Sequence, residues 1–244
     1  MKIPRPIQVL LALILYIGLF AFIISQVADV LDFSSLIQSS GMLLKGAGLT
    51  IGLSLASLAS SLILGFIIFL MTETESVFIK TTAEIYKEII MGTPLLVLVF
   101  VVVYIIGVAL GIRNKMILGF LALTLYMSPY MTNIFDGAYK SIDRNQFIIM
   151  DLYKFNLFQR YRYIILPQML RPIVPGLINN LSGIIKGTSI LSTIAISEIF
   201  YTTSVLSNNS YRYIEGYFVL WMVYLLITIP LSRLAKSFSR QQTY

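Results

Sequence analysis

The chain has 244 residues, of which 57% are hydrophobic and 12% are charged, and its mean hydropathy is +0.85. Soluble globular domains carry about a quarter charged residues, so this composition predicts an integral membrane protein. The sequence contains neither cysteine nor histidine. Thiol catalysis, disulfides, imidazole general bases and the common zinc sites are therefore excluded for this chain.

Six apolar runs are long enough to cross a membrane, because about 20 helical residues span roughly 30 Å of hydrocarbon. We therefore predict an all-α membrane protein with about six transmembrane helices. The first run follows Lys2 and Arg5 and lacks a small-x-small cleavage site, which indicates an uncleaved anchor helix within residues 1–30. The runs are Ile7–Val27, Leu43–Met71, Ile89–Leu110, Met116–Phe135, Ile173–Ile199 and Tyr213–Leu234.

The placement of Lys and Arg predicts the orientation of these runs, since both residues accumulate in short cytoplasmic loops. If both termini are cytoplasmic, the outside holds only Lys45, Arg113, Lys115 and Arg212. The inside then holds Lys2, Arg5, Lys80, Lys87, Lys140, Arg144, Lys154, Arg160, Arg162, Arg171, Arg233, Lys236 and Arg240. The formal net charge of +7 is thus mostly a topology signal, and we expect no nucleic-acid partner.

Residues 136–172 form a long connection between the fourth and fifth runs. Within it, NQFIIMDLYKFNLFQRYRYIILP mixes apolar, aromatic and basic residues at helical spacing. This pattern predicts one or two short helices along the cytoplasmic surface. Their aromatic side chains face either a partner protein or the lipid headgroups; they are Tyr153, Phe155, Phe158 and Tyr161.

Lys186 lies in LSGIIKGTSILS (Leu181–Ser192), a stretch that has no other charge. A phosphate-binding P-loop is excluded, because Lys precedes Gly here and no strand comes before it. A continuous helix advances 100° per residue, which places several polar residues on the face of Lys186. They are Asn179, Ser182, Ser189, Thr193 and Ser197.

A polar face within a membrane span lines a solute path, or it bonds to a neighbouring helix. Both interpretations remain open for the Ser and Thr positions. For Lys186 we expect a place beside the path or an ion pair, because an ammonium group in hydrocarbon costs several kcal/mol. Glu198 and Asp136 are the carboxylates that such a pair would use.

The segment IILPQMLRPIVPGLINNLSGIIKGTSILSTIAISEIF resembles a region of the ABC-transporter permeases that import polar amino acids of the histidine and glutamine type. In that family it follows the EAA loop, which docks the ATPase. Three more stretches agree in the correct order, and the resemblance covers residues 42–240. They are LLKGAGLTIGLSLAS, GTPLLVLVF and YFVLWMVYLLITIPLSRLAK.

The chain departs from the family pattern mainly at charged positions and in the EAA loop. Ile148, Ile149 and Met150 replace Glu-Ala-Ala, and Lys154 replaces a Gly that lets two short helices turn. Elsewhere, Gly187 replaces Asp, Asn133 replaces Glu, Asp136 replaces Arg and Met91 replaces Arg.

The resemblance implies a type I ABC importer permease fold over residues 42–240, preceded by the extra anchor helix and including the coupling loop 136–172. It implies a transport subunit of the bacterial cytoplasmic (inner) membrane rather than an enzyme. The implied partners are two ABC ATPase subunits, an extracytoplasmic solute-binding protein and a second permease copy or paralogue. ATP and Mg²⁺ would bind the ATPases, so no cofactor is expected on this chain.

The residue types leave two alternatives: an ion-coupled secondary transporter of small polar solutes and a membrane scaffold without transport activity. The first is disfavoured by the few intramembrane acids and by the lack of an evident internal repeat, and the second by the polar face. For the importer we expect the translocation path at Asn133, Asn179, Ser182, Lys186, Thr188, Ser189, Thr193 and Glu198. We expect ATPase coupling at Asp151, Tyr153, Lys154, Phe155, Phe158 and Tyr161.

Overall fold

The structure is a computed structural model that describes residues 4–28 and 31–240. Every regular element in this part of the chain is helical. Among the described residues, four helices are long and apolar enough to cross a membrane, and the number of spans is up to six if each of two bent helix pairs counts as one span. The prediction of about six spans in an all-α protein is confirmed. The four long helices are α1 (Arg5–Val27), α3 (Ser40–Thr72), α7 (Lys115–Lys140) and α12 (Tyr213–Arg240).

The first bent pair replaces the single helix predicted at Ile89–Leu110. Helix α4 (Val77–Gly92) ends before Pro94, and Thr93 between them is extended because a residue before proline disfavours the helical conformation. The chain then turns by 109°. It continues as α5 (Leu95–Phe100), the π-helical η2 (Val101–Ile106) and α6 (Gly107–Ala109).

The second bent pair corrects the predicted fifth span. Helix α10 (Leu166–Gly187) follows a π-helical turn, η3 (Arg160–Ile165), and ends at Gly187. The chain continues as the 3₁₀-helix η4 (Thr188–Ile194) and then bends by 51° into α11 (Ile199–Ser210). The expectation of one continuous helix from Asn179 to Ser197 is therefore wrong beyond Gly187.

Hydroxyl groups accompany the change from α-helix to 3₁₀-helix at Gly187. The Thr188 hydroxyl donates to the Ile185 carbonyl at 2.7 Å, three residues back. Three more side chains in η4 repeat this bond to the third residue before them, and they are Ser189, Ser192 and Thr193. Such local bonds compete with the α-helical pattern and suit a 3₁₀-helix. The left-handed backbone of Ala195, with φ 62°, then ends the 3₁₀-helix.

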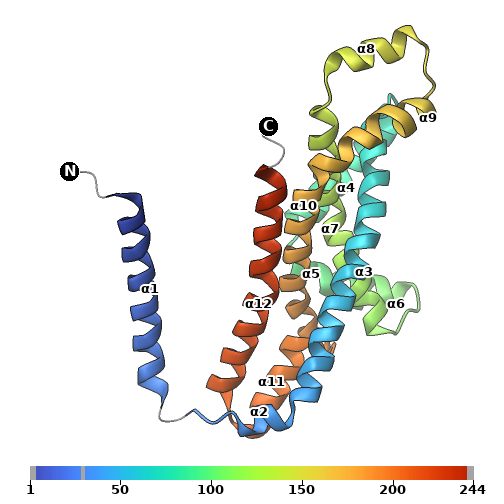
Figure 1. The fold of residues 1–244 in the computed structure, drawn as a ribbon. Helices are drawn as coiled ribbons and strands as arrows, with labels where there is room; N and C mark the ends of the chain where they lie inside the picture. The colour runs from blue at the N-terminus through green and yellow to red at the C-terminus, as the bar shows by residue number, and fades with distance from the viewer. Residues whose placement is uncertain (1–3, 29–30, 241–244) are drawn as a thin grey trace.

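Helices α3 and α7 form the centre of the molecule, with α10, α11 and α12 packed on one side (Figure 1). Helix α1 stands apart, and the window that qualifies it as a span is 0% buried. It touches α12 through Phe20, whose ring lies 5.7 Å from that of Trp221. The start of α1, the end of α12 and helix α8 (Arg144–Leu152) lie at one end of the molecule.

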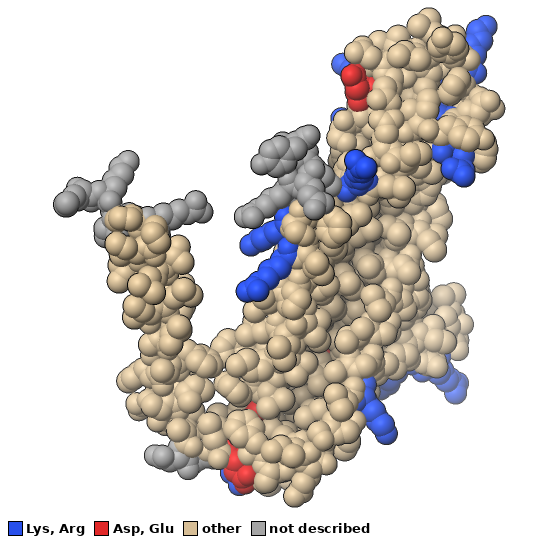
Figure 2. Space-filling model, in the orientation of Figure 1, with Lys and Arg blue, Asp and Glu red and all other residues tan. Residues whose placement is uncertain are grey.

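The opposite end carries the short helix α2 (Ser34–Gln38) and the turn between α11 and α12. Most of the Lys and Arg side chains visible in Figure 2 lie toward the end with α8, and smaller groups lie at the opposite end. The two ends therefore differ in charge, which is the asymmetry that the positive-inside rule uses.

Candidate functional site

A groove of about 440 Å³ opens on the face formed by α10, η4, α11 and α12. Lys186 is the one charged residue among those that line it. Aromatic rings form much of its wall, and the hydroxyl oxygen of Tyr224 is buried there. The remaining lining residues are Ser189, Phe200, Tyr217, Leu220, Trp221, Leu225 and Thr228. The groove thus combines one cation, several hydroxyls and an aromatic wall.

Lys186 makes no ion pair with any residue that the structure describes. The two carboxylates proposed for it from the sequence have other partners. Asp136 accepts from the Lys140 ammonium at 2.8 Å. Glu198 caps α11 by accepting from the backbone N–H groups of Phe200 at 3.0 Å and Tyr201 at 2.7 Å. The side chain of Lys186 is exposed on this chain.

Glu198 is fully buried, and its neighbours show that it shapes the site rather than lining the groove. Its side chain satisfies two amide groups at the start of α11, which otherwise have no partner within the helix. The Thr50 hydroxyl of α3 accepts from the Ile199 N–H at 3.1 Å and fixes this helix start against the centre of the bundle. Thr50 was missed in the sequence because a buried threonine in a span carries no signal of its own.

The remaining expected path residues are not brought together. Ser182 and Thr188 are buried, with 7% and 0% of their surface exposed, whereas Asn179 and Thr193 are exposed. Of the eight expected positions, the groove gathers Lys186 and Ser189.

Asn133 lies on α7 beside Met91, and its amide nitrogen is 3.8 Å from the Met91 sulfur. These are two positions where the family resemblance predicts Glu and Arg. The two departures from the family pattern are therefore neighbours in space, and they make a neutral contact.

The expected coupling segment forms α8 and a second short helix, α9 (Leu157–Gln159). Tyr153 and Phe158 are 74% and 69% exposed and are free to meet a partner. Phe155 and Tyr161 instead pack against the core formed by residues such as Met150. Asp151, on α8, accepts from the Arg160 guanidinium at 2.6 Å and ties the two ends of the loop together.

Lys154 occupies the turn between α8 and α9 with a left-handed backbone, φ 51°. This is the position where the resemblance predicts glycine. The backbone geometry of the turn is thus kept although the residue that favours it is absent, and a non-glycine residue there costs about 1 kcal/mol.

The comparisons with known proteins agree with this architecture. Residues 47–243 match the family described as "Binding-protein-dependent transport system inner membrane component". The chain is 27% identical over 215 residues to the "Probable amino-acid permease protein YxeN" of Bacillus subtilis, which covers 87% of this chain and 96% of that protein. It is 24% identical over 200 residues to the "Histidine/lysine/arginine/ornithine transport system permease protein HisQ" of Salmonella typhimurium, which covers 78% and 88%.

Solved structures show the same fold. The chain superposes on a chain of an "amino acid ABC transporter with histidines" with a TM-score of 0.77 at 26% identity, covering 86% of this chain and 99% of that chain. The MetNI methionine ABC transporter in an inward-facing conformation gives a TM-score of 0.66 at 15% identity, covering 82% and 98%.

The chain belongs to the family of inner-membrane components of binding-protein-dependent transport systems, because the match covers most of its length. It has the permease fold of an ABC importer and is a transport component. This membership decides against the ion-coupled secondary transporter and the scaffold. Helices α1 and α2 precede residue 47 and so lie outside the region that defines the family.

Proposed function

We propose that the chain is the membrane-spanning permease subunit of an ATP-driven importer for polar amino acids. The observation that carries this proposal is the family match over residues 47–243, together with the amino-acid substrates in the names of the relatives. Two separate ATPase subunits bind ATP and Mg²⁺, and an extracytoplasmic solute-binding protein delivers the amino acid. The complex lies in the bacterial inner membrane.

The end with α8 faces the cytoplasm, because most Lys and Arg residues gather there. The ATPase docks on the exposed side chains of the α8–α9 loop, with Tyr153 and Phe158 as its main contacts. ATP-driven closure of the ATPase pair moves this loop as a lever and tilts α7 and α10, which it joins.

The groove beside Lys186 lines the translocation path. A free amino acid presents a carboxylate, for which the Lys186 ammonium is the complement. The hydroxyl of Ser189 offers a hydrogen bond to the remaining polar groups, and the aromatic wall packs the side chain. None of the described residues that line the groove carries a carboxylate, which favours substrates without a strong positive charge over cationic ones.

A second permease chain completes the path. A homodimer is the simpler assembly, and a heterodimer with a paralogue that retains the Glu-Ala-Ala loop is the alternative, because this chain lacks that sequence. Mass measurement of the intact complex separates the two assemblies. Two copies of a 27.5 kDa chain leave no mass for a paralogue.

The proposal is tested by reconstituting the chain in liposomes with the ATPase and solute-binding protein encoded beside it. We expect ATP hydrolysis to rise when the binding protein and a polar amino acid are both present, and the labelled amino acid to accumulate inside. Uptake driven by an ion gradient without ATP would contradict the proposal, and uptake of a solute other than an amino acid would contradict its substrate class.

A further inference from the structure

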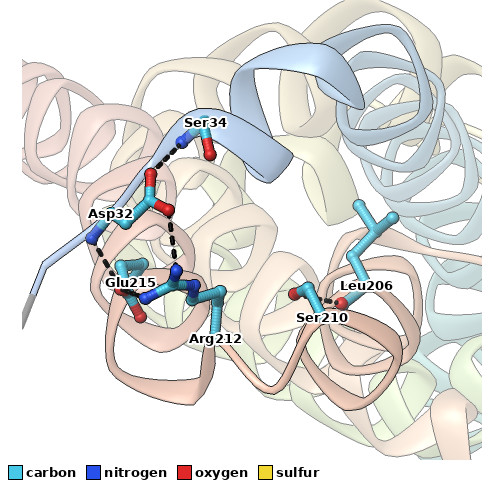
Figure 3. A network of polar contacts seen from close by, with 6 residues as sticks. All are labelled: Asp32, Ser34, Leu206, Ser210, Arg212 and Glu215. Carbon is cyan, nitrogen blue, oxygen red and sulfur yellow. Dashed lines mark hydrogen bonds and ion pairs between the residues drawn. The ribbon is translucent and has the colours of Figure 1, made fainter.

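Three charged residues join the segment after α1 to the start of α12 (Figure 3). The Arg212 guanidinium donates to the Asp32 carboxylate at 2.7 Å. The Asp32 N–H donates to the Glu215 carboxylate at 2.8 Å, and Arg212 lies 3.7 Å from the same carboxylate oxygen. We call this group of Asp32, Arg212 and Glu215 the clasp. It links parts of the chain that are 180 residues apart in the sequence.

The clasp holds a short segment across the end of α11. Residues 31–38, which we call the strap, include α2, and Leu36 of α2 is 3% exposed. Leu36 and Ser35 share a small cavity of about 150 Å³ with Leu206 and Ser210 in the last two turns of α11. The ring of Phe33 lies 6.3 Å from that of Phe218 on α12. The strap therefore contacts both α11 and α12.

The position of α11 matters for the path, because Phe200 of this helix lines the groove. Its first turn is fixed to α3 through Glu198 and Thr50, and its last turn lies under the strap. The helix also follows the 51° bend, so the contacts of its last turn set the direction in which it runs from its fixed start. Whatever holds the end of α11 thus sets the shape of the groove on the side away from α8.

We propose that the clasp is a latch, with Asp32, Arg212 and Glu215 as positioning residues for transport. The closed clasp keeps the strap on the end of α11 and holds the extracytoplasmic side of the path shut. The clasp opens when the transport cycle moves α12 away from α1. This inference rests on the proposed function as a permease, and it concerns a part of the chain, the strap, that lies before the family region begins at residue 47.

The exposure of the charged groups suits a contact that opens and re-forms. The side chains of Arg212 and Asp32 are 39% and 43% exposed, and ion pairs of this kind contribute little stability. Glu215 is nearly buried, and the Arg212 guanidinium lies beside its carboxylate as well as that of Asp32. Loss of Arg212 leaves these two acids facing each other without a cation, and it should open the clasp more than loss of the Asp32 charge.

The Asp32 carboxyl of the clasp is held in its charged form. The N–H of Ser34 and, to a smaller extent, the Arg212 guanidinium lower the pKa of the Asp32 carboxyl below its usual value of 3.8. A carboxylate with a lowered pKa stabilises the folded state above its usual pKa and loses this contribution only as the pH falls through the lowered value. Asp32 therefore stays charged throughout the physiological range.

The lack of native cysteine gives a direct test. Ser35 belongs to the strap, and its side-chain oxygen is buried on the side that faces α11. Replacing it by Cys places one thiol where only strap release exposes it. We expect its reaction with a membrane-impermeant maleimide, in the assembled complex, to accelerate about two- to fivefold in Arg212→Ala, the shift that loss of a partly exposed ion pair produces. Arg212→Lys should stay near the parent rate. Trapping the parent complex outward-facing with ATP and vanadate should accelerate the reaction similarly.

Arg113→Ala is the matched control, because Arg113 is an exposed cation that lies outside the clasp and that the topology places on the same side of the membrane as Arg212. Equal rates in Arg113→Ala and Arg212→Ala, or no acceleration in the trapped complex, would overturn the latch. If Arg212→Ala does not assemble, Asp32→Asn gives the same test. We then expect a smaller increase in the rate of the maleimide reaction, and an unchanged rate would refute the latch. Solute-stimulated ATP hydrolysis in the parent complex shows separately whether the proposed function holds.

Discussion

Replacing Lys186 with Met should reduce amino-acid transport strongly while leaving assembly with the ATPase unchanged. Met keeps most of the side-chain volume and removes the one charge among the residues that line the groove. A hydrogen bond to a charged group contributes about 1.5–3 kcal/mol. If Lys186 binds the substrate carboxylate, its loss lowers transport efficiency by about 10- to 150-fold, at about 1.4 kcal/mol for each factor of ten.

The assay is initial uptake of labelled amino acid over a range of concentrations of the loaded solute-binding protein. Lys186→Arg should recover part of the activity, because it restores the charge with a different shape. Lys45→Met is the control, since Lys45 is an exposed cation on α3 away from the groove. Wild-type uptake by Lys186→Met would refute the reasoning and leave Lys186 as a residue that serves only the fold.

Three further predictions concern the coupling loop and the start of α11. Replacing Tyr153 and Phe158 with Ser should abolish solute-stimulated ATP hydrolysis without loss of thermal stability, because both rings are exposed. Phe155→Ser should instead lower the thermal stability, since that ring packs on the core. Lys154→Gly should raise the free energy of unfolding by about 0.5 kcal/mol, because the relief of strain at the left-handed backbone exceeds the entropy cost of glycine. A lowered melting temperature would contradict this prediction. Glu198→Ala should lower the free energy of unfolding by about 2 kcal/mol, because it removes the cap of α11, and the loss is measurable as faster thermal inactivation. Glu198→Gln should retain most of this stability. Equal losses in the two variants would argue against capping.

In the α8–α9 loop, sequence patterns predict the helices but not which side chains are buried. The helical spacing of apolar residues predicted short surface helices there, and these helices are present. The same pattern did not separate Tyr153, which is exposed, from Phe155, which packs on the core. Both are aromatic residues two positions apart, and only the direction in which the chain turns at Lys154 decides which ring meets the protein.

The Lys186 region shows a second limit. A helical wheel assumes 100° per residue, and this holds only as far as Gly187, after which the chain continues as a 3₁₀-helix. The two carboxylates available in the sequence also proved to have other partners, since Asp136 bonds to Lys140 and Glu198 caps α11. An ion pair depends on which helices approach each other, and composition carries no information on that approach.

The sequence by itself determined the membrane class, the number of spans and the family resemblance, because hydropathy and short motifs are local properties of the chain. Tertiary structure decided the groove shared by α10, η4, α11 and α12 and the clasp between Asp32 and Arg212. Each of these features depends on contacts between residues far apart in the sequence. Such contacts follow from the packing of whole helices, and so no window along the chain contains them.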